Sequence, residues 1–180
     1  MRSLCEICLL SSPSLWLSKC MRGSAKQAAT EFALVIQEAL NVLGPAKVTL
    51  SAGDADNRFG LTVNRDEGIV DGGWHFNLRM TIQVTVEHDD WIIRTSSYLY
   101  SLRERDRDGL REMLEYHWDP RRPPHVHVQG GKDHKPTGRV LLEDVLEYCI
   151  VEVGWRPRLP GWRATLTATK AHFQLNRHWD

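Results

Sequence analysis

Four of the eight histidines fall within eighteen residues, at His117, His125, His127 and His134. Near neutral pH, an uncharged imidazole can bind a metal ion, transfer a proton or accept a hydrogen bond. His125 and His127 are separated by one residue, and this spacing puts both rings on the same side of a β-strand. We therefore expect any chemistry of this chain to lie in the segment from His117 to His134.

The residues around these histidines predict how they are brought together. A loop at 119–123 separates two β-rich segments, which predicts an antiparallel hairpin. If His117 lies opposite His125, the aromatic and aliphatic side chains of both strands share one face, whereas a slip of one residue would mix them with histidines. Side chains that share a face lie roughly 4.5–8 Å apart. The preferred register therefore gathers four polar residues on the other face: Glu115, His117, His125 and His127.

Basic residues near the histidines are candidates for holding a substrate. Arg121 and Arg122 lie in the hairpin loop, and Lys132, Lys135 and Arg139 follow within the next twenty residues. In a chain without net charge, such a group would act as a local positive rim. The rim could hold a phosphate.

The place of two tyrosines depends on a turn at 106–109 whose length the sequence leaves open. One register of the strand before this turn puts Tyr98 and Tyr100 beside His117. The other register puts both tyrosines in the core. Both alternatives stay open at this point.

Hydrophobic periodicity predicts the elements that carry the hairpin. Residues 24–43 have apolar side chains at helical spacing, with Ser24 as a cap and Gly44-Pro45 as the stop. Strict alternation from Phe76 to Val86 predicts a strand with one buried face. A loop is expected between Asp66 and Gly73. Further strands are expected at 47–51, 58–64, 91–103, 110–118 and 124–129, and further helices at 139–153 and 162–177.

Together these elements predict an α+β fold. We expect an antiparallel β-meander of about four to six strands, with an N-terminal helix and two C-terminal helices packed on one face. The covered face would be the one that carries Phe76 and Val84.

The composition fits one globular domain. The chain has 180 residues, of which 42% are hydrophobic and 26% charged, and this excludes a fibrous or disordered protein. The 23 basic and 23 acidic side chains cancel, which excludes a global field that attracts nucleic acid or membranes. No stretch approaches the roughly eighteen apolar residues that cross a bilayer. Four unevenly placed cysteines do not form a disulfide framework, which favours a reducing cytoplasm.

Residues 1–20 are expected to be a disordered extension, followed by a single domain at 21–180. Glu6 interrupts the apolar run near the start, and Pro13 and Lys19 follow it, so the segment does not fit a signal peptide. Met21 begins a more orderly sequence and is an alternative start of translation.

Three functions are open for the histidine-rich face. A metal site would use His117, His125 and His127, with Glu115 or His134 completing a set for Zn²⁺, Fe²⁺ or Mn²⁺. A metal-free nucleic-acid site would use one imidazole as base, another as acid, and an Arg or Lys to stabilise the transition state. A polar face that only makes hydrogen bonds or contacts a partner protein would need no chemistry.

Part of the chain resembles the TumE-type toxin family, a group of small bacterial proteins. In that family, two strands with aromatic and acidic residues lead into a Pro-His-rich segment and a closing helix. The resemblance covers about a third of the chain, roughly residues 97–154. It is carried by Ser97-Tyr98-Leu99-Tyr100, Leu114-Glu115-Tyr116-His117-Trp118-Asp119, Pro124-His125-Val126-His127-Val128 and Leu142-Glu143-Asp144-Val145-Leu146.

The resemblance implies a bacterial cytoplasmic protein from a toxin–antitoxin or defence locus, which acts on RNA or translation. It implies that the residues of functional interest are His117, Asp119, His125 and His127. We therefore expect binding or cleavage of RNA without a metal or other cofactor, with RNA and an antitoxin-like protein as partners. The alternatives are a non-catalytic interaction module and an enzyme with a His-ligated metal. The expected catalytic residues are Glu115, His117, His125 and His127, and the expected substrate-binding residues are Tyr98, Tyr100, Arg121, Arg122 and Lys135.

Overall fold

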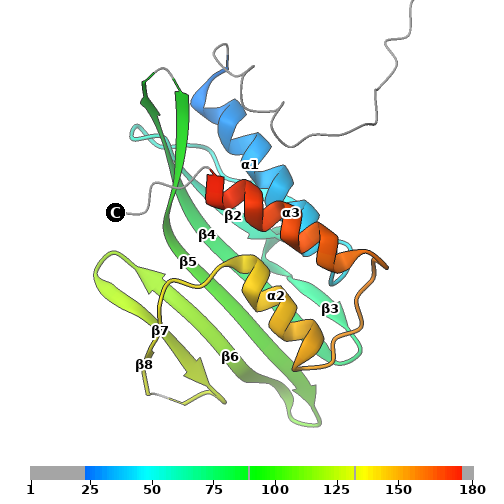
Figure 1. The fold of residues 1–180 in the computed structure, drawn as a ribbon. Helices are drawn as coiled ribbons and strands as arrows, with labels where there is room; N and C mark the ends of the chain where they lie inside the picture. Colours follow the sequence, from blue (N-terminus) through cyan, green and yellow to red (C-terminus); the bar gives the residue numbers. More distant parts are fainter. Residues whose placement is uncertain (1–22, 89, 132, 176–180) are drawn as a thin grey trace, which may run out of the picture.

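The structure, a computed structural model, describes residues 23–88, 90–131 and 133–175 (Figure 1). The extension expected at 1–20, and Lys132 of the basic rim, lie outside these residues. Within them the chain forms three helices, α1 (Ala25–Leu40), α2 (Leu142–Val151) and α3 (Trp162–Leu175). The strands are β1 (Val48–Leu50), β2 (Arg58–Val63), β3 (Ile69–Asp71), β4 (Trp74–Glu87), β5 (Asp90–Asp106), β6 (Gly109–Asp119), β7 (Arg122–Val128) and β8 (Lys135–Pro136).

All strands belong to one antiparallel sheet in the order β1-β2-β4-β5-β6-β7-β8, and β3 pairs with β4. The α+β fold, with one helix before the sheet and two after it, is confirmed. The expected number of four to six strands is wrong, because the sheet has eight. The additional strands include β3, with three residues, and β8, with two. Segments this short show no periodicity, so a sequence pattern does not reveal them.

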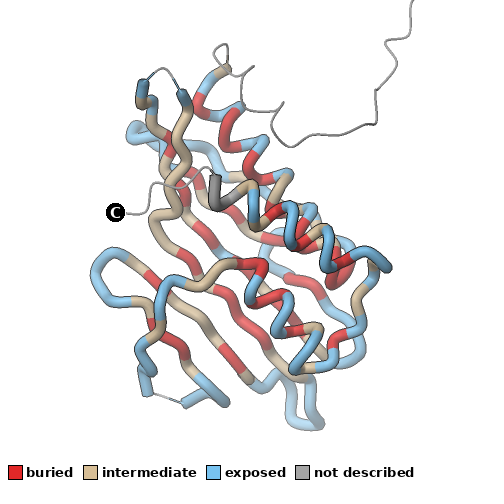
Figure 2. The backbone as a smooth tube through the Cα atoms, in the orientation of Figure 1, coloured by how far each residue is buried: buried red, intermediate tan, exposed pale blue. Residues whose placement is uncertain are grey.

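The three helices lie on one face of the sheet (Figure 1), and the core lies between the two layers. Phe76, Leu78 and Ile82 of β4 are fully buried there, as are Ile36 and Leu40 of α1. Figure 2 shows the buried residues in the inward faces of the helices and along the strands beneath them. Burial of one such side chain stabilises the fold by about 1.5–3 kcal/mol. The helices therefore cover the predicted face of the sheet.

Local contacts fix the ends of α1. Ser24 accepts a hydrogen bond through its hydroxyl from the backbone N–H of Gln27, at 3.3 Å, and so caps the first turn. After the helix, the indole N–H of the buried Trp155 donates to the carbonyl of Leu43, at 3.1 Å. This bond ties the segment after α2 to the end of α1. The expected N-cap is confirmed.

The hairpin of β6 and β7 has the register predicted from its apolar residues. His117 pairs with His125, and Glu115 pairs with His127. On the other face of the hairpin, Leu114, Trp118 and Val126 are buried on the helix side. The polar side chains therefore lie on the face of the sheet that no helix of the described residues covers.

The segment between β2 and β3 is a left-handed turn. Asn64, Arg65 and Asp66 have φ values of 48°, 56° and 74°, a conformation that costs a non-glycine residue roughly 1–3 kcal/mol. The sequence predicted only a loop from Asp66 to Gly73, and the structure adds β3 within it. A turn that costs this much needs bonds that hold it in place.

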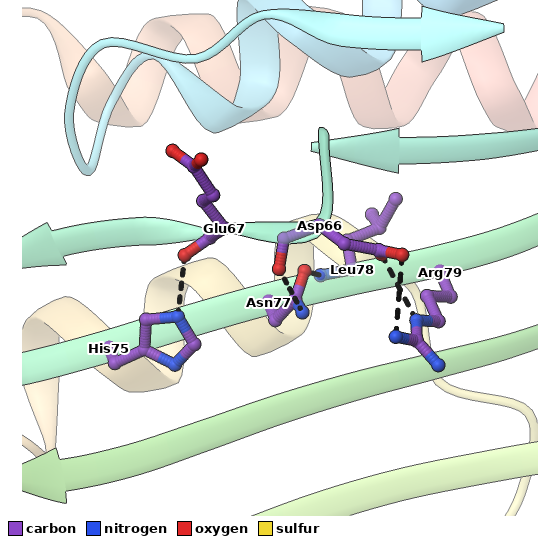
Figure 3. A network of polar contacts seen from close by, with 6 residues as sticks. All are labelled: Asp66, Glu67, His75, Asn77, Leu78 and Arg79. Carbon is purple, nitrogen blue, oxygen red and sulfur yellow. Dashed lines mark hydrogen bonds and ion pairs between the residues drawn. The ribbon is translucent and has the colours of Figure 1, made fainter. Parts of the chain in front are cut away.

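Side chains of β4 provide these bonds (Figure 3). The ring Nε2 of His75 donates to the carbonyl of Glu67 at 2.7 Å, and the Nδ2 of Asn77 donates to the carbonyl of Asp66 at 3.2 Å. Arg79 binds both carboxylate oxygens of Asp66, at 3.0 and 3.3 Å. The turn is thereby attached to β4 through three side chains that alternate along one face of this strand.

Candidate metal centre

Three histidines converge at the edge formed by β7 and β8. His125 and His127 alternate along β7, and His134 comes directly before β8, which pairs back on β7 at His125 and Val126. The ring centroid of His134 lies 4.5 Å from that of His125 and 4.5 Å from that of His127. One ring nitrogen from each residue lies within 4.8 Å of the other two. We call this group the histidine triad.

The triad is close to the size that a metal ion requires. Around three atoms no more than 4.8 Å apart there is always a point within about 2.8 Å of each, whereas a Zn–N bond measures about 2.0–2.1 Å. Movements of less than about 1 Å by each ring would therefore complete the coordination. Side-chain rotations of His127 and of the exposed His134 can supply such movements.

Hydrogen bonds fix which nitrogen is available in two of the rings. The Nδ1 of His125 lies 3.0 Å from the carbonyl oxygen of Pro123, and the Nδ1 of His127 lies 3.1 Å from that of Gly131. A carbonyl oxygen only accepts, so each Nδ1 carries the proton and each Nε2 keeps its lone pair. Metal-binding histidines typically have this arrangement, with the second nitrogen held by a carbonyl.

The Nε2 of His125 is the most informative atom of the triad. The residue is only 4% exposed, and this nitrogen has no hydrogen-bond partner among the described residues. A buried polar atom without a partner costs roughly 1–3 kcal/mol. A metal ion bound through this nitrogen would satisfy its lone pair.

His117 stands beside the triad rather than in it. Its ring centroid lies 5.0 Å from that of His125, and its Nε2 lies 3.7 Å from a carboxylate oxygen of Asp119. Desolvation and then the neighbouring His125 lower the pKa of His117, although Asp119 opposes this shift. The third member of the triad is His134, and the prediction that His117 is the third metal ligand is not the arrangement found here. His117 is therefore available for proton transfer.

Glu115 lies across from His127 on β6, next to the triad. Burial raises its pKa, and repulsion from Glu112 adds to this effect, while His127 and Arg103 oppose it. A carboxylate with a raised pKa accepts a proton more readily near neutral pH than an ordinary one. The structure thus brings together Glu115, His117, His125 and His127 as expected, and adds His134.

The two arginines expected in the hairpin loop have different surroundings. Arg121 donates from its backbone N–H and from Nε to Asp119, at 2.8 and 3.2 Å. The expected place of Arg122 in the loop is wrong, because Arg122 begins β7, where it is exposed and pairs with Asp119. After desolvation and the neighbouring histidines, its charge also lowers the pKa of His117 and of His134.

The two other described members of the expected basic rim lie in different segments, Lys135 on β8 and Arg139 in the segment between β8 and α2. Lys135 is exposed on β8, opposite Val126. The guanidinium of Arg139 lies 3.9 Å above the ring of Trp118, which belongs to the helix side of the sheet. Arg139 is thus engaged away from the triad.

The structure does not bring the two tyrosines to the histidines. Tyr98 and Tyr100 are each 3% exposed and stack on each other, with centroids 4.6 Å apart, on the helix side of the sheet. The hydroxyl of Tyr98 accepts a hydrogen bond from the backbone N–H of Val140 at 2.9 Å. The pairing of Tyr98 with Trp118 sets this register. Of the two open alternatives, the position in the core is the observed one.

The sequence predicted His134 only as an alternative to Glu115 for completing a metal site, and the structure makes it a full member of the triad. Its place depends on the two-residue strand β8, which only its pairing with β7 reveals. The signal that could have found it is Gln129-Gly130-Gly131, because Gln129 and Gly130 have positive φ values of 55° and 65° and turn the chain back.

Comparisons with protein-family models, with curated proteins and with solved structures gave no match for this chain. Among the described residues, none of the helices combines the length and the apolar character needed to cross a membrane. The function has to be inferred from the geometry of the site.

Proposed function

We propose that this protein binds a divalent transition-metal ion, Zn²⁺ in the first place, through His125, His127 and His134. The ion would have an open position for hydrolytic chemistry. The observation that carries this proposal is the approach of three ring nitrogens to within 4.8 Å of one another. Imidazole suits Zn²⁺ and its neighbours in the first transition series, whereas Mg²⁺ and Ca²⁺ prefer oxygen ligands.

The number of ligands and their exposure favour a catalytic site over a structural one. Structural zinc sites have four protein ligands, whereas catalytic sites have three and leave one position for water or substrate. His134 is exposed and His127 is half-buried, so this position would face solvent. A bound divalent ion supplies Lewis-acid chemistry and lowers the pKa of a water there to about 7.

Two neighbours of the triad have the properties of proton carriers. The raised pKa of Glu115, caused first by burial, suits it to accept a proton from an attacking water. The lowered pKa of His117, caused first by desolvation, keeps its ring neutral and able to receive a proton at pH 7. Both lie on the same face of β6, opposite the two ligands of β7.

A second candidate is the metal-free cleavage of RNA that the TumE-type resemblance implies, in a cytoplasmic protein with an antitoxin-like partner. The approach of the His117 Nε2 to a carboxylate oxygen of Asp119, at 3.7 Å, favours it, because a carboxylate orients a catalytic imidazole. This mechanism also needs a second imidazole that reaches the substrate. His125 is poorly suited to that role, since it is buried and its Nδ1–H is bound to the Pro123 carbonyl. We therefore place this candidate second.

Metal titration of the purified full chain tests the first proposal. After treatment with a chelator and its removal, calorimetry with Zn²⁺ is expected to show one ion bound per chain. His127→Ala and His134→Ala are each expected to weaken binding by about 100-fold or more, since loss of even an outer-shell partner costs about 10–100-fold. The matched control is His88→Asn, which removes a histidine at the exposed turn between β4 and β5. Circular dichroism checks that each variant is folded.

Two results would overturn the metal proposal: no stoichiometric binding by the wild-type chain, or an affinity of His134→Ala equal to that of His88→Asn. An RNA cleavage assay in the presence of a chelator tests the second candidate. Cleavage that persists in the chelator and is lost in His117→Ala would favour the metal-free mechanism. Absence of cleavage in the chelator would count against it.

A further inference from the structure

We propose that the substrate of this metal centre is a phosphate ester, and that the guanidinium of Arg122 binds its phosphoryl oxygens. This inference rests on the proposed metal site. It adds the class of substrate and the residue that selects it.

The charge of the loaded site favours an anion. Three neutral imidazoles leave the 2+ charge of the ion uncompensated, unlike the carboxylate ligands of many other metal sites. No carboxylate of the described residues belongs to the triad. Asp119 is bound to Arg121 and faces His117, at 3.2 and 3.7 Å. A cationic site of this kind raises the local concentration of anionic substrates.

Arg122 is placed to meet such an anion. It pairs with Asp119 across the hairpin, but Asp119 is already engaged by Arg121. Among residues 23–88, 90–131 and 133–175, no hydrogen bond or ion pair holds the guanidinium of Arg122. The side chain belongs to an exposed residue of β7, three positions before His125 and opposite Asp119, whose carboxylate lies 3.7 Å from the Nε2 of His117. Arg122 is thus a positively charged side chain near the triad, and its guanidinium is free to bind a ligand.

The chemistry of a guanidinium explains why a phosphate fits best. Its planar fork donates two parallel hydrogen bonds to two oxygens of one phosphoryl group, which a lysine cannot do. A third oxygen remains for the metal, and both positive groups would contact the oxygens on which negative charge develops in the transition state. A carboxylate has only two oxygens, so it cannot satisfy the fork and the metal with separate atoms. The tetrahedral oxyanion therefore fits both elements of the site at once.

The reaction balances as a hydrolysis. The oxygen of a water forms a new bond to phosphorus, and the ester P–O bond breaks with its electron pair on the leaving alcohol oxygen. The proton released by the water is accepted by Glu115, and the alcohol oxygen receives a proton from a neighbouring group or from solvent. No oxidant or reductant is required.

Binding of inorganic phosphate to the Co²⁺-loaded full chain tests the inference. Co²⁺ takes the same ligands as Zn²⁺ and has a visible spectrum that depends on its coordination. Co²⁺ is titrated first, without phosphate, and phosphate is then added to the loaded protein. We expect the spectrum to change on addition of phosphate. Phenyl phosphate and a dinucleotide are tested next, to distinguish a monoester from a diester substrate.

The variants separate the two proposals. Arg122→Ala is expected to bind Co²⁺ like the wild type but phosphate at least about 10-fold more weakly, and Arg122→Lys to recover only part of the loss. Arg111→Ala is the matched control, because it removes the same charge at an exposed position near the start of β6. If the wild-type chain binds no Co²⁺, both proposals fail. If it binds Co²⁺ but does not respond to phosphate, or if Arg122→Ala responds like the wild type, only the substrate inference fails.

Discussion

His117 and His125 face each other across β6 and β7, with ring centroids 5.0 Å apart and ring planes at 63°. Their surroundings differ although they are neighbours. The His117 side chain is 31% exposed and lies near Asp119, whereas His125 is buried and has a nitrogen without a partner. The two rings are therefore suited to different tasks, proton transfer for His117 and metal binding for His125.

The stability of the metal-free protein is expected to fall as the pH falls below 6.5. Desolvation lowers the pKa of His117 below its ordinary value of 6.5, and the pKa values of His134 and His172 are also lowered. Between the folded and the ordinary pKa, the unfolded chain binds more protons, so acid favours unfolding. Urea unfolding in a chelator at several pH values measures the slope of the free energy of unfolding against pH. His117→Gln should make it shallower, and His88→Asn should leave it unchanged; an equal slope in both variants would contradict the assignment.

Removal of the Tyr98 hydroxyl is expected to destabilise the fold without affecting the metal centre. In Tyr98→Phe the backbone N–H of Val140 loses its acceptor at 2.9 Å, which costs about 1–2 kcal/mol. Urea unfolding measures the loss, and Zn²⁺ calorimetry should give the wild-type affinity because Tyr98 lies on the other face of the sheet. Tyr148→Phe, at a side chain that is 40% exposed, should change stability by less than about 0.5 kcal/mol. A weaker metal affinity in Tyr98→Phe would contradict the separation of the two faces.

A glycine in the left-handed turn between β2 and β3 is expected to stabilise the fold. Arg65 has φ 56° and ψ 39°, and glycine adopts this conformation without a steric penalty. Arg65→Gly should therefore raise the free energy of unfolding by about 0.5–1 kcal/mol, measured in urea. Arg65→Ala keeps the Cβ atom and should bring no gain. A gain from alanine would mean that the charge of Arg65, and not its backbone, was unfavourable.

Gly68, just after that turn, is expected to tolerate no side chain. A Cβ atom there would lie 2.5 Å from the carbonyl oxygen of Phe76 and 2.6 Å from Nε2 of His75, and φ is +74°. Gly68→Ala should cost more than about 2 kcal/mol, because both contacts and the backbone oppose it. Gly72→Ala is the control: its φ is also positive, at +53°, but a Cβ atom would meet nothing within 4 Å. Thermal unfolding should therefore separate the two variants, and equal losses would refute the steric explanation.

Much of this fold could be predicted from the sequence, because long elements repeat their patterns. The alternation from Phe76 to Val86 fixed both the existence of β4 and its buried face. In contrast, β3 and β8 have too few residues for a pattern, and only their pairing with β4 and β7 defines them. Pairing between distant segments is a tertiary property that local periodicity does not contain.

Some features of the candidate site could likewise be predicted from the sequence, and others could not. The register that places His117 opposite His125 followed from matching apolar faces, since any slip would have put polar side chains among Trp118 and Val126. The position of His134 did not follow, because it depends on β8. Neither did the position of Tyr98, because several turn lengths fit between β5 and β6.

The alternation of β7 also limits how this protein can vary in length. Val126 packs into the core, and its two neighbours on β7, His125 and His127, belong to the triad on the other face. One inserted residue in the middle of this strand would move imidazoles into the core and valines into solvent, so it would damage the core and the site together. Insertions and deletions in related chains should therefore be found in the exposed turn between β5 and β6, and be absent from the interior of the two strands that carry the histidines.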